Sequence, residues 1–264
     1  MRAFFGTRRP ACVPWPRPAL AVLLLLGAAG CATAPERLPP VLGGVPADQV
    51  DALVRRWEAE WREFRGLRAA VDLTVVRNGR AQRTAGALLV SPTHLRFEAI
   101  TPLGFPAIVV TAAPDRLLVF SPTERRAWSA RPTAEAMSRW LGVPLEPQTL
   151  TRILTGHVPA PPDGVPVRVK QDRGPHLVFE RAGATQRVWV TADGRPARFE
   201  RANGQRVTAT FDRTVDGRIA SVSLEVPSQS VEAQLRYISG DSVALPPEAF
   251  EITVPPGVVI ERVD

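Results

Sequence analysis

The most regular pattern in the chain is an alternation of apolar and polar residues between positions 67 and 130, which predicts β-strands. From Leu67 to Val75 every second side chain is apolar, the period of a strand with one buried face. Asn78-Gly79 then supplies a two-residue hairpin turn, because both residues tolerate positive φ. Further strands are expected at 80–90, 94–100, 107–112, 116–121 and 125–130. The connections are short, so this part of the chain is predicted to form an antiparallel meander.

The second half of the chain shows the same strand pattern. Strands are expected at 165–170, 176–181, 186–191, 197–202, 206–212, 218–226 and 231–239, with a last edge strand at Phe250–Val254. The turn dipeptides Asp193-Gly194, Asn203-Gly204 and Asp216-Gly217 separate several of them. No strand–helix–strand alternation occurs, which argues against a parallel sheet.

Three segments have helical signals instead. In the first, 46–64, the apolar residues share one face: Val50, Leu53, Val54, Trp57, Trp61 and Phe64. Its polar face carries both charge signs, so we favour packing on a sheet over an interfacial membrane helix. Thr133 is a plausible N-cap for a second helix ending at Gly142, and a third is expected at 147–154. The predicted fold is mostly β: a strongly curved antiparallel sheet or incomplete β-barrel, with an N-terminal helix and a two-helix insert covering its open side.

The first thirty residues have the features of a secretory signal. Four arginines and no acidic residue precede an apolar run, Ala19–Ala29, that is too short to span a bilayer of about 30 Å. The sequence Ala28-Ala29-Gly30-Cys31 resembles a bacterial lipobox, which implies that Cys31 is acylated and becomes the mature N-terminus. An ordinary signal peptide with a chance cysteine is the alternative. The expected organisation is a signal peptide at 1–30, a flexible acylated tether at 31–45 and a single domain at 46–264.

Composition narrows the range of functions. Loss of the four leader arginines lowers the formal charge from +7 to about +3, and no basic cluster is interleaved with aromatic residues, so nucleic acid is not an expected partner. The two cysteines, Cys12 and Cys31, both precede the predicted domain, which therefore has no disulfide and depends on core burial.

The sequence shows no motif for a catalytic or metal-binding site. The histidines, His94, His157 and His176, lie far apart, without Cys or carboxylates at ligand spacing, so no metal site is expected. No nucleophile elbow or phosphate-binding glycine loop occurs. We therefore expect no enzyme activity and no cofactor, although a sheet can bring together a catalytic pair that spacing does not reveal.

The connection at 101–106 is apolar where turns are normally polar. Its side chains Leu103 and Phe105 are either folded into the core or displayed to solvent. Display forgoes about 1.5–3 kcal/mol of burial for each side chain, a cost that a membrane or an acyl chain can offset.

Segments in the first half of the predicted domain resemble the LolB family of outer-membrane lipoprotein receptors. The resemblance rests on the strand order from Leu67, on His94–Phe97, on Thr101-Pro102-Leu103-Gly104, and on the run Trp140–Leu145 followed by Ile153–Gly156. It covers 64–159, and the C-terminal half matches only in its general strand pattern.

The resemblance implies a half-open barrel that holds the acyl chains of another lipoprotein in an apolar hollow. Such a protein receives its cargo from a soluble periplasmic carrier and releases it into the outer membrane without covalent chemistry. Leu103 matches the family's membrane-insertion position, and Phe105 extends the apolar loop. Six residues are candidates either to line the hollow or to fill it: Leu73, Val75, Phe97, Trp128, Met137 and Leu141.

The expected function is therefore that of a monomeric lipoprotein on the periplasmic face of the outer membrane, which binds acylated lipoprotein cargo and outer-membrane lipid. Ala32 in place of Asp after Cys31 favours outer-membrane delivery, by analogy with enteric bacteria. Two alternatives stay open. One is an envelope assembly or stress-sensing lipoprotein with a filled core and protein partners, and the other is a carrier of a different amphiphile such as a glycolipid.

Overall fold

The computed structural model describes residues 47–159, 167–170, 176–181 and 184–263. The predicted signal peptide, Cys31 and the predicted tether lie outside the described residues. The described residues all belong to one compact unit. None of the described helices is long and apolar enough to cross a membrane.

The described part of the chain contains three α-helices and fourteen strands. The helices are α1 (Ala47–Glu63), α2 (Ala134–Leu141) and α3 (Pro147–Leu154). The first strands are β1 (Leu67–Arg77), β2 (Arg80–Val90), β3 (Leu95–Ile100), β4 (Pro106–Ala112), β5 (Leu117–Ser121), β6 (Arg126–Ala130) and β7 (Val167–Lys170). The others are β8 (His176–Arg181), β9 (Ala184–Val190), β10 (Pro196–Asn203), β11 (Gln205–Arg213), β12 (Ile219–Val226), β13 (Val231–Ser242) and β14 (Val259–Arg262).

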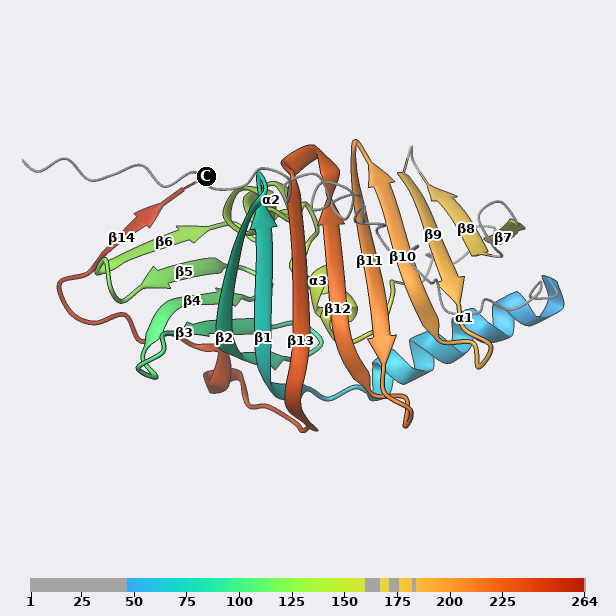
Figure 1. The fold of residues 1–264 in the computed structure, drawn as a ribbon, viewed down its shortest axis with the longest axis horizontal. Helices are drawn as coiled ribbons and strands as arrows, with labels where there is room; N and C mark the ends of the chain where they lie inside the picture. The colour runs from blue at the N-terminus through green and yellow to red at the C-terminus, as the bar shows by residue number, and fades with distance from the viewer. Residues whose placement is uncertain (1–46, 160–166, 171–175, 182–183, 264) are drawn as a thin grey trace, which may run out of the picture. The chain divides into compact units, whose positions relative to one another are not determined.

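All of these strands belong to one curved open sheet, in the order β14-β6-β5-β4-β3-β2-β1-β13-β12-β11-β10-β9-β8-β7 (Figure 1). Two antiparallel meanders meet where β1 pairs with β13, and Leu73 lies opposite Leu235 in that register. The β1–β2 turn has positive φ at Asn78 and Gly79, as predicted for a two-residue hairpin. The predicted fold class is confirmed.

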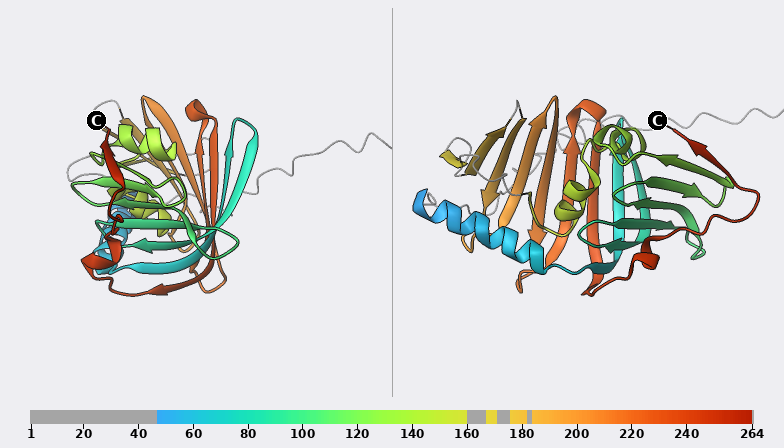
Figure 2. Two further views of the ribbon diagram at one scale, coloured as in Figure 1. Left: turned by 90° about the vertical axis from the view of Figure 1, so that its left-hand side faces the viewer. Right: turned by 180° about the vertical axis from the view of Figure 1, so that it is seen from behind.

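The helices lie on the core side of the sheet (Figure 2). Thr133 caps α2 by accepting a hydrogen bond from the amide of Ala136 at 3.2 Å, and Gly142 ends the helix with φ of 71°. The main core joins inward-facing strand residues to Trp57 of α1, Met137 of α2 and Ile153 of α3. Burial of these apolar faces is what holds three short helices against the sheet.

The C-terminal segment corrects the sequence-based expectation. The prediction of a strand at Phe250–Val254 is wrong. A short 3₁₀ helix (Pro247–Phe250) occupies the start of this segment, and the last strand of the described chain is β14. Strand β14 pairs with β6 in parallel, so the sheet is not antiparallel throughout. Ile252, Val254 and Val258 pack on a second small core formed by outward-facing residues of β5 and β6, which are Leu118, Phe120 and Ala127. The alternation of apolar and polar residues in this segment therefore reflects one buried face, although the segment does not pair with a strand.

Candidate functional site

The loop between β3 and β4 is a tight turn organised by Thr101. The Thr101 amide donates to the Phe105 carbonyl at 2.8 Å, and the Thr101 hydroxyl accepts from the Phe105 amide at 3.2 Å. Gly104 closes the turn with φ of 84°, a conformation that L side chains rarely adopt. The backbone groups thus bond within the turn, and the side chains of Leu103 and Phe105 are 83% and 68% exposed. The loop thus displays both side chains, and their role in membrane insertion stays a prediction.

An apolar surface continues from this loop along the core side of β3 and β4. Ile108 is 44% exposed and shares a strand face with Val110, which belongs to the main core. Ile108 lies opposite Ala99, and Val110 lies opposite Phe97. The exposed loop and the core of the sheet are therefore connected by apolar side chains on one face.

Gly86 of β2 makes room for Phe97 on this surface. A Cβ at Gly86 would come within 2.7 Å of the Phe97 ring and 2.7 Å of the Glu98 carbonyl oxygen. Real Cβ contacts are not this short, so a side chain here forces the ring or the neighbouring strand to shift. The position of the Phe97 ring therefore depends on the glycine.

The six residues predicted for the hollow are distributed over this core. Met137 is fully buried, and Leu73, Phe97, Trp128 and Leu141 are partly buried and pack against the main core. Val75 is half-buried on β1. Leu73 also contributes to a cavity of about 430 Å³ whose other lining residues are mostly polar. Whether these side chains contact an acyl chain stays a prediction.

Trp128 links β6 to two other elements. Its Nε1 donates to Glu261 Oε2 of β14 at 3.1 Å, and its ring lies 5.4 Å from that of Trp140 in α2. Hydrogen bonding from Arg126 holds the pKa of Glu261 below its usual value. Sequence reasoning missed this connection, because no local pattern relates Glu261 to Trp128.

A second contact joins α1 to α3. Arg152 forms an ion pair with Glu58 at 2.5 Å and lies 4.8 Å from the centre of the Trp61 ring. His157 packs edge-on against Trp61, with ring centres 5.3 Å apart. Burial, together with the positive charges of Arg213 and Arg152, lowers the pKa of His157 to about 4, so the ring is neutral near pH 7.

The residues after α3 line a cavity of about 220 Å³ that also contains Trp57 and Arg195. Arg213 donates from Nη2 to the Gly156 carbonyl at 2.7 Å, and so satisfies a carbonyl at the end of α3. Burial, and then the charge of Arg195, lower the pKa of Arg213 from its ordinary value. We interpret Arg213 as a helix-capping residue.

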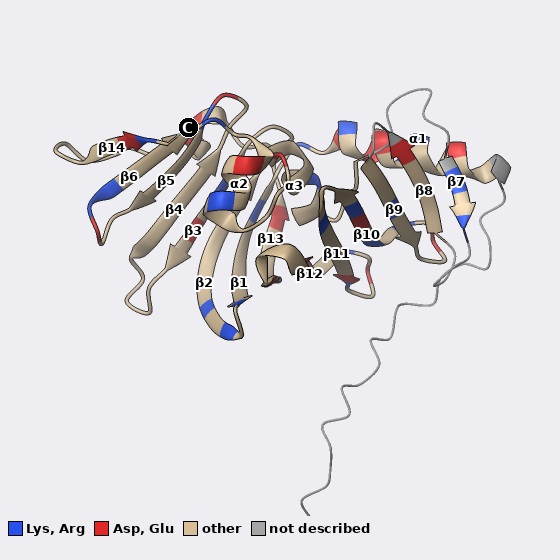
Figure 3. Cartoon of the chain, turned by 90° about the horizontal axis from the view of Figure 1, so that it is seen from above, with Lys and Arg blue, Asp and Glu red and all other residues tan. Residues whose placement is uncertain are grey.

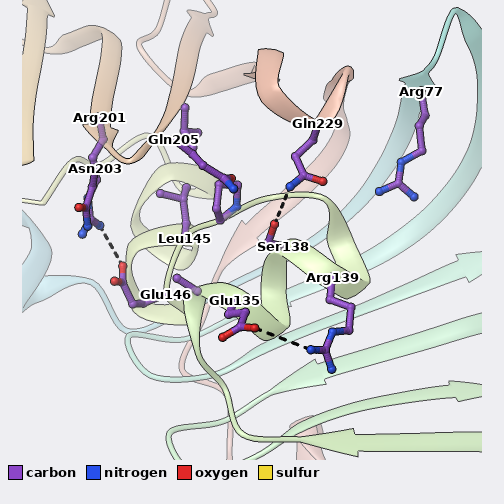
Figure 4. A pocket seen from close by; sticks show the side chains of 13 residues that line it. Arg77, Glu135, Ser138, Arg139, Leu145, Glu146, Arg201, Asn203, Gln205 and Gln229 are labelled. Carbon is purple, nitrogen blue, oxygen red and sulfur yellow. Dashed lines mark hydrogen bonds and ion pairs between the residues drawn. The ribbon is translucent and has the colours of Figure 1, made fainter. Parts of the chain in front are cut away.

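A larger cavity, of about 440 Å³, lies between α2, the α2–α3 connection and the ends of β1, β10 and β11 (Figure 4). Glu135 pairs with Arg139 at 3.8 Å, and Glu146 pairs with Arg201 at 2.9 Å. Partial burial opposes ionisation of Glu146, but hydrogen bonding and the Arg201 charge keep its pKa below the usual value. This lining suits a polar group better than an acyl chain.

The described residues hold no cluster of three His, Cys, Asp or Glu side chains that could bind a metal ion. His94, His157 and His176 belong to three separate aromatic contacts: His94 with Phe250, His157 with Trp61 and His176 with Trp189. The candidate site is therefore the apolar loop and the core face behind it.

Comparison with known proteins places this fold in a structural class. The sequence matches no family model and no curated protein. A solved structure from Vibrio parahaemolyticus, described as a candidate outer membrane lipoprotein-sorting protein domain, aligns with a TM-score of 0.55 and 13% identity, covering 78% of this chain and 97% of that chain. A DUF1329 family protein from Desulfovibrio piger aligns with a TM-score of 0.51 and 11% identity, covering 79% and 98%.

A LolA superfamily protein from Nitrosomonas europaea also aligns, with a TM-score of 0.49 and 14% identity, covering 79% of this chain and 99% of that chain. At these identities the likeness to the two structures with TM-scores of 0.55 and 0.51 is one of fold alone: a curved open sheet with helices on one side. The comparison thus supports the fold that the sequence resemblance implied, and the LolB assignment stays a prediction.

Proposed function

We propose that this protein is a lipoprotein anchored through Cys31 to the periplasmic face of the outer membrane, where it receives acylated lipoproteins and inserts them into the bilayer. The acyl chains contact the apolar core face of the sheet, and Leu103 and Phe105 contact the membrane. A soluble periplasmic protein delivers the cargo. In this function the protein works without covalent chemistry, so it requires binding surfaces and no catalytic residues.

The observation that carries this proposal is the display of Leu103 and Phe105 at the tip of a hairpin. Two large apolar side chains in water forgo about 1.5–3 kcal/mol of burial each. The apolar face continues from the loop to Ile108 and Phe97. Insertion into a bilayer recovers the burial energy and brings the core face close to the lipid.

A second candidate function has its own observation. Met137 of α2, Leu145 of the α2–α3 connection and Ile153 of α3 are fully buried, so the helical insert packs into the core side of the sheet. A filled core suits an envelope assembly or stress-sensing lipoprotein that binds proteins through its surface. In that case the exposed loop contacts a protein partner and no acyl chain enters the sheet.

Native mass spectrometry of residues 39–264 mixed with a diacylated peptide separates the two functions. The lipoprotein-handling function predicts a one-to-one complex of the protein with the diacylated peptide. Excess diacylated peptide should compete for this complex, and the unacylated peptide should not. Phe97→Trp on the core face adds a fluorescent reporter for the same complex. A protein that binds neither peptide, with no change in the tryptophan emission of the Phe97→Trp variant, contradicts acyl binding and favours the interaction module.

A further inference from the structure

Five of the seven large apolar side chains that are exposed in the described part of the chain lie at one end of the sheet. They are Leu103, Phe105 and Ile108 near the β3–β4 loop, and Val259 and Ile260 at the start of β14. Strand pairing brings the two groups together: β14 runs parallel to β6, and β5 pairs antiparallel with both β4 and β6. Strands β4, β6 and β14 therefore all begin at this end, which is on the left in Figure 1.

The β3–β4 loop and the turn before β14 are close enough to meet one planar surface. Three strand spacings of about 4.8 Å separate β4 from β14, so the two connections lie about 14 Å apart across the sheet. Figure 3 shows that both are uncharged. The β5–β6 turn between them carries Glu124 and Arg125, whose charged ends can stay among polar headgroups while the flanking connections enter the lipid.

The turn before β14 is built in a way that lowers the cost of leaving water. Pro255 and Pro256 are exposed, and neither has a backbone N–H. The Val258 amide donates to the Pro255 carbonyl at 3.3 Å within the turn. Few backbone donors are thus left that would lose a hydrogen bond to water in an apolar environment.

The exposed apolar side chains of β14 occur on both faces of the sheet. Val259 lies opposite Arg126, on the face that carries Trp128 and the main core. Ile260 lies opposite Ala127, on the outer face that carries the second core. A protein that packs on one face of the sheet would cover only one of these two side chains, whereas a lipid layer that surrounds the sheet end covers both.

We propose that residues 255–260 form a second membrane-inserting element, which enters the same lipid leaflet beside Leu103 and Phe105. This inference rests on the proposed function, because it extends the same membrane contact to a distant part of the sequence. Two inserted elements on different strands also fix the orientation of the sheet end against the bilayer, which a single loop cannot do. The partner of this surface is therefore the lipid bilayer itself.

The test uses residues 39–264 with vesicles of phosphatidylcholine. This unit contains every described helix and strand and both hydrophobic cores, so it folds without the preceding segment and carries no lipid anchor. It also has no cysteine, because both cysteines of the chain lie in the first 31 residues. A single introduced cysteine can therefore be labelled with NBD, a fluorophore whose emission shifts to the blue in an apolar environment.

Three labelled variants report on three positions. Val259→Cys places the label on β14, Leu103→Cys places it on the β3–β4 loop, and Val215→Cys places it in an exposed turn between β11 and β12. We expect vesicles to shift the emission of the labels at positions 259 and 103 to the blue. The label at position 215 should keep its emission.

Partition coefficients measure the contribution of β14 without a label. Val259→Ser combined with Ile260→Ser should bind the vesicles about tenfold more weakly than the wild type, because two apolar side chains lose their contact with lipid. The matched control, Val215→Ser combined with Ile238→Ser, removes the same two residue types at exposed positions elsewhere and should bind like the wild type. Far-UV circular dichroism checks that both variants are folded.

A label at position 259 that stays in a polar environment while the label at position 103 shifts overturns the inference and leaves the membrane contact of the β3–β4 loop intact. A shift at position 259 that needs high protein concentration and no vesicles also overturns it, and would indicate that the β14 edge pairs with a second copy of the chain. If both labels shift with vesicles but the protein binds no acylated peptide, the lipid contact stands and cargo handling fails.

Discussion

Glu58 of α1 and Arg152 of α3 form an ion pair of 2.5 Å that ties the N-terminal helix to the helical insert. The Arg152 side chain is 19% exposed and the Glu58 side chain is 34% exposed, so water screens the pair only in part. Arg152 also lies over the face of Trp61. Two residues that are 94 positions apart in the sequence thus fix their helices against one another on the core side of the sheet.

Arg152→Gln should lower the free energy of unfolding by about 2 kcal/mol, because it removes a charged hydrogen bond and a cation–π contact. Urea denaturation of residues 39–264 at pH 7.5 measures the change. Arg218→Gln is the control, since its pair with Asp216 is exposed on both sides and should contribute less than about 1 kcal/mol. Equal losses of unfolding free energy in the two variants would show that the Glu58–Arg152 pair contributes no more to stability than an exposed ion pair.

His157 should make the protein less stable as the pH falls through the weakly acidic range. The pKa is about 4 in the folded protein and 6.5 in the unfolded chain, so the unfolded state binds the extra proton. The stabilisation is complete above pH 6.5 and is lost progressively down to pH 4. Between pH 7.5 and pH 5 we expect a loss of about 2 kcal/mol, which His157→Gln should not show. The same pH dependence in both proteins would assign the effect to other groups.

Gly86→Val should destabilise the protein by about 1–3 kcal/mol, because its side chain overlaps the Phe97 ring and the Glu98 carbonyl oxygen. Thermal unfolding measures the loss, and near-UV circular dichroism reports the displaced ring. Gly240→Ala is the control, because a Cβ there makes only ordinary contacts with Leu67 and Ala69. A neutral Gly86→Val variant would show that the strand adapts without moving Phe97.

Two truncations should separate the roles of the C-terminal segment. Removal of residues 259–264 deletes β14, whose Val259 and Ile260 are exposed, and should cost little core burial. Removal of residues 252–264 also uncovers Leu118 and Phe120, and should cost a further 3 kcal/mol or more, at about 1.5–3 kcal/mol per side chain. Urea denaturation compares the two proteins, and equal stabilities would contradict the second core.

Local signals in the sequence were sufficient for the helices and hairpins. The Asn78-Gly79 turn, the Thr133 cap and the 147–154 helix depend on neighbouring residues, and the structure has all three. The alternation of Ile252 and Val254 was misleading for a physical reason. Alternation reports that one face is buried, and a segment packed across a sheet has the same pattern as a strand paired within it.

Contacts between residues that are far apart in the sequence have no local pattern that predicts them. The pairing of β1 with β13, the parallel addition of β14 and the Trp128–Glu261 hydrogen bond all join parts of the chain that lie far apart. At the candidate site, the sequence shows that the β3–β4 loop is apolar, but it does not determine whether Leu103 and Phe105 are buried or exposed. Leu103 and Phe105 are exposed because no other element of the described chain covers this turn, and that depends on the tertiary arrangement.

Insertion by the β3–β4 loop is tested by the transfer of a fluorescent diacylated peptide from preloaded protein into vesicles, with Leu103→Glu compared with the wild type. Val215→Glu is the matched control, because Val215 is a fully exposed apolar residue in a different turn. We predict that Leu103→Glu keeps peptide binding but transfers at least about tenfold more slowly, since a charge opposes insertion by roughly 1.4 kcal/mol or more, whereas Val215→Glu transfers at the wild-type rate. Unimpaired transfer by Leu103→Glu would contradict the insertion role of the loop.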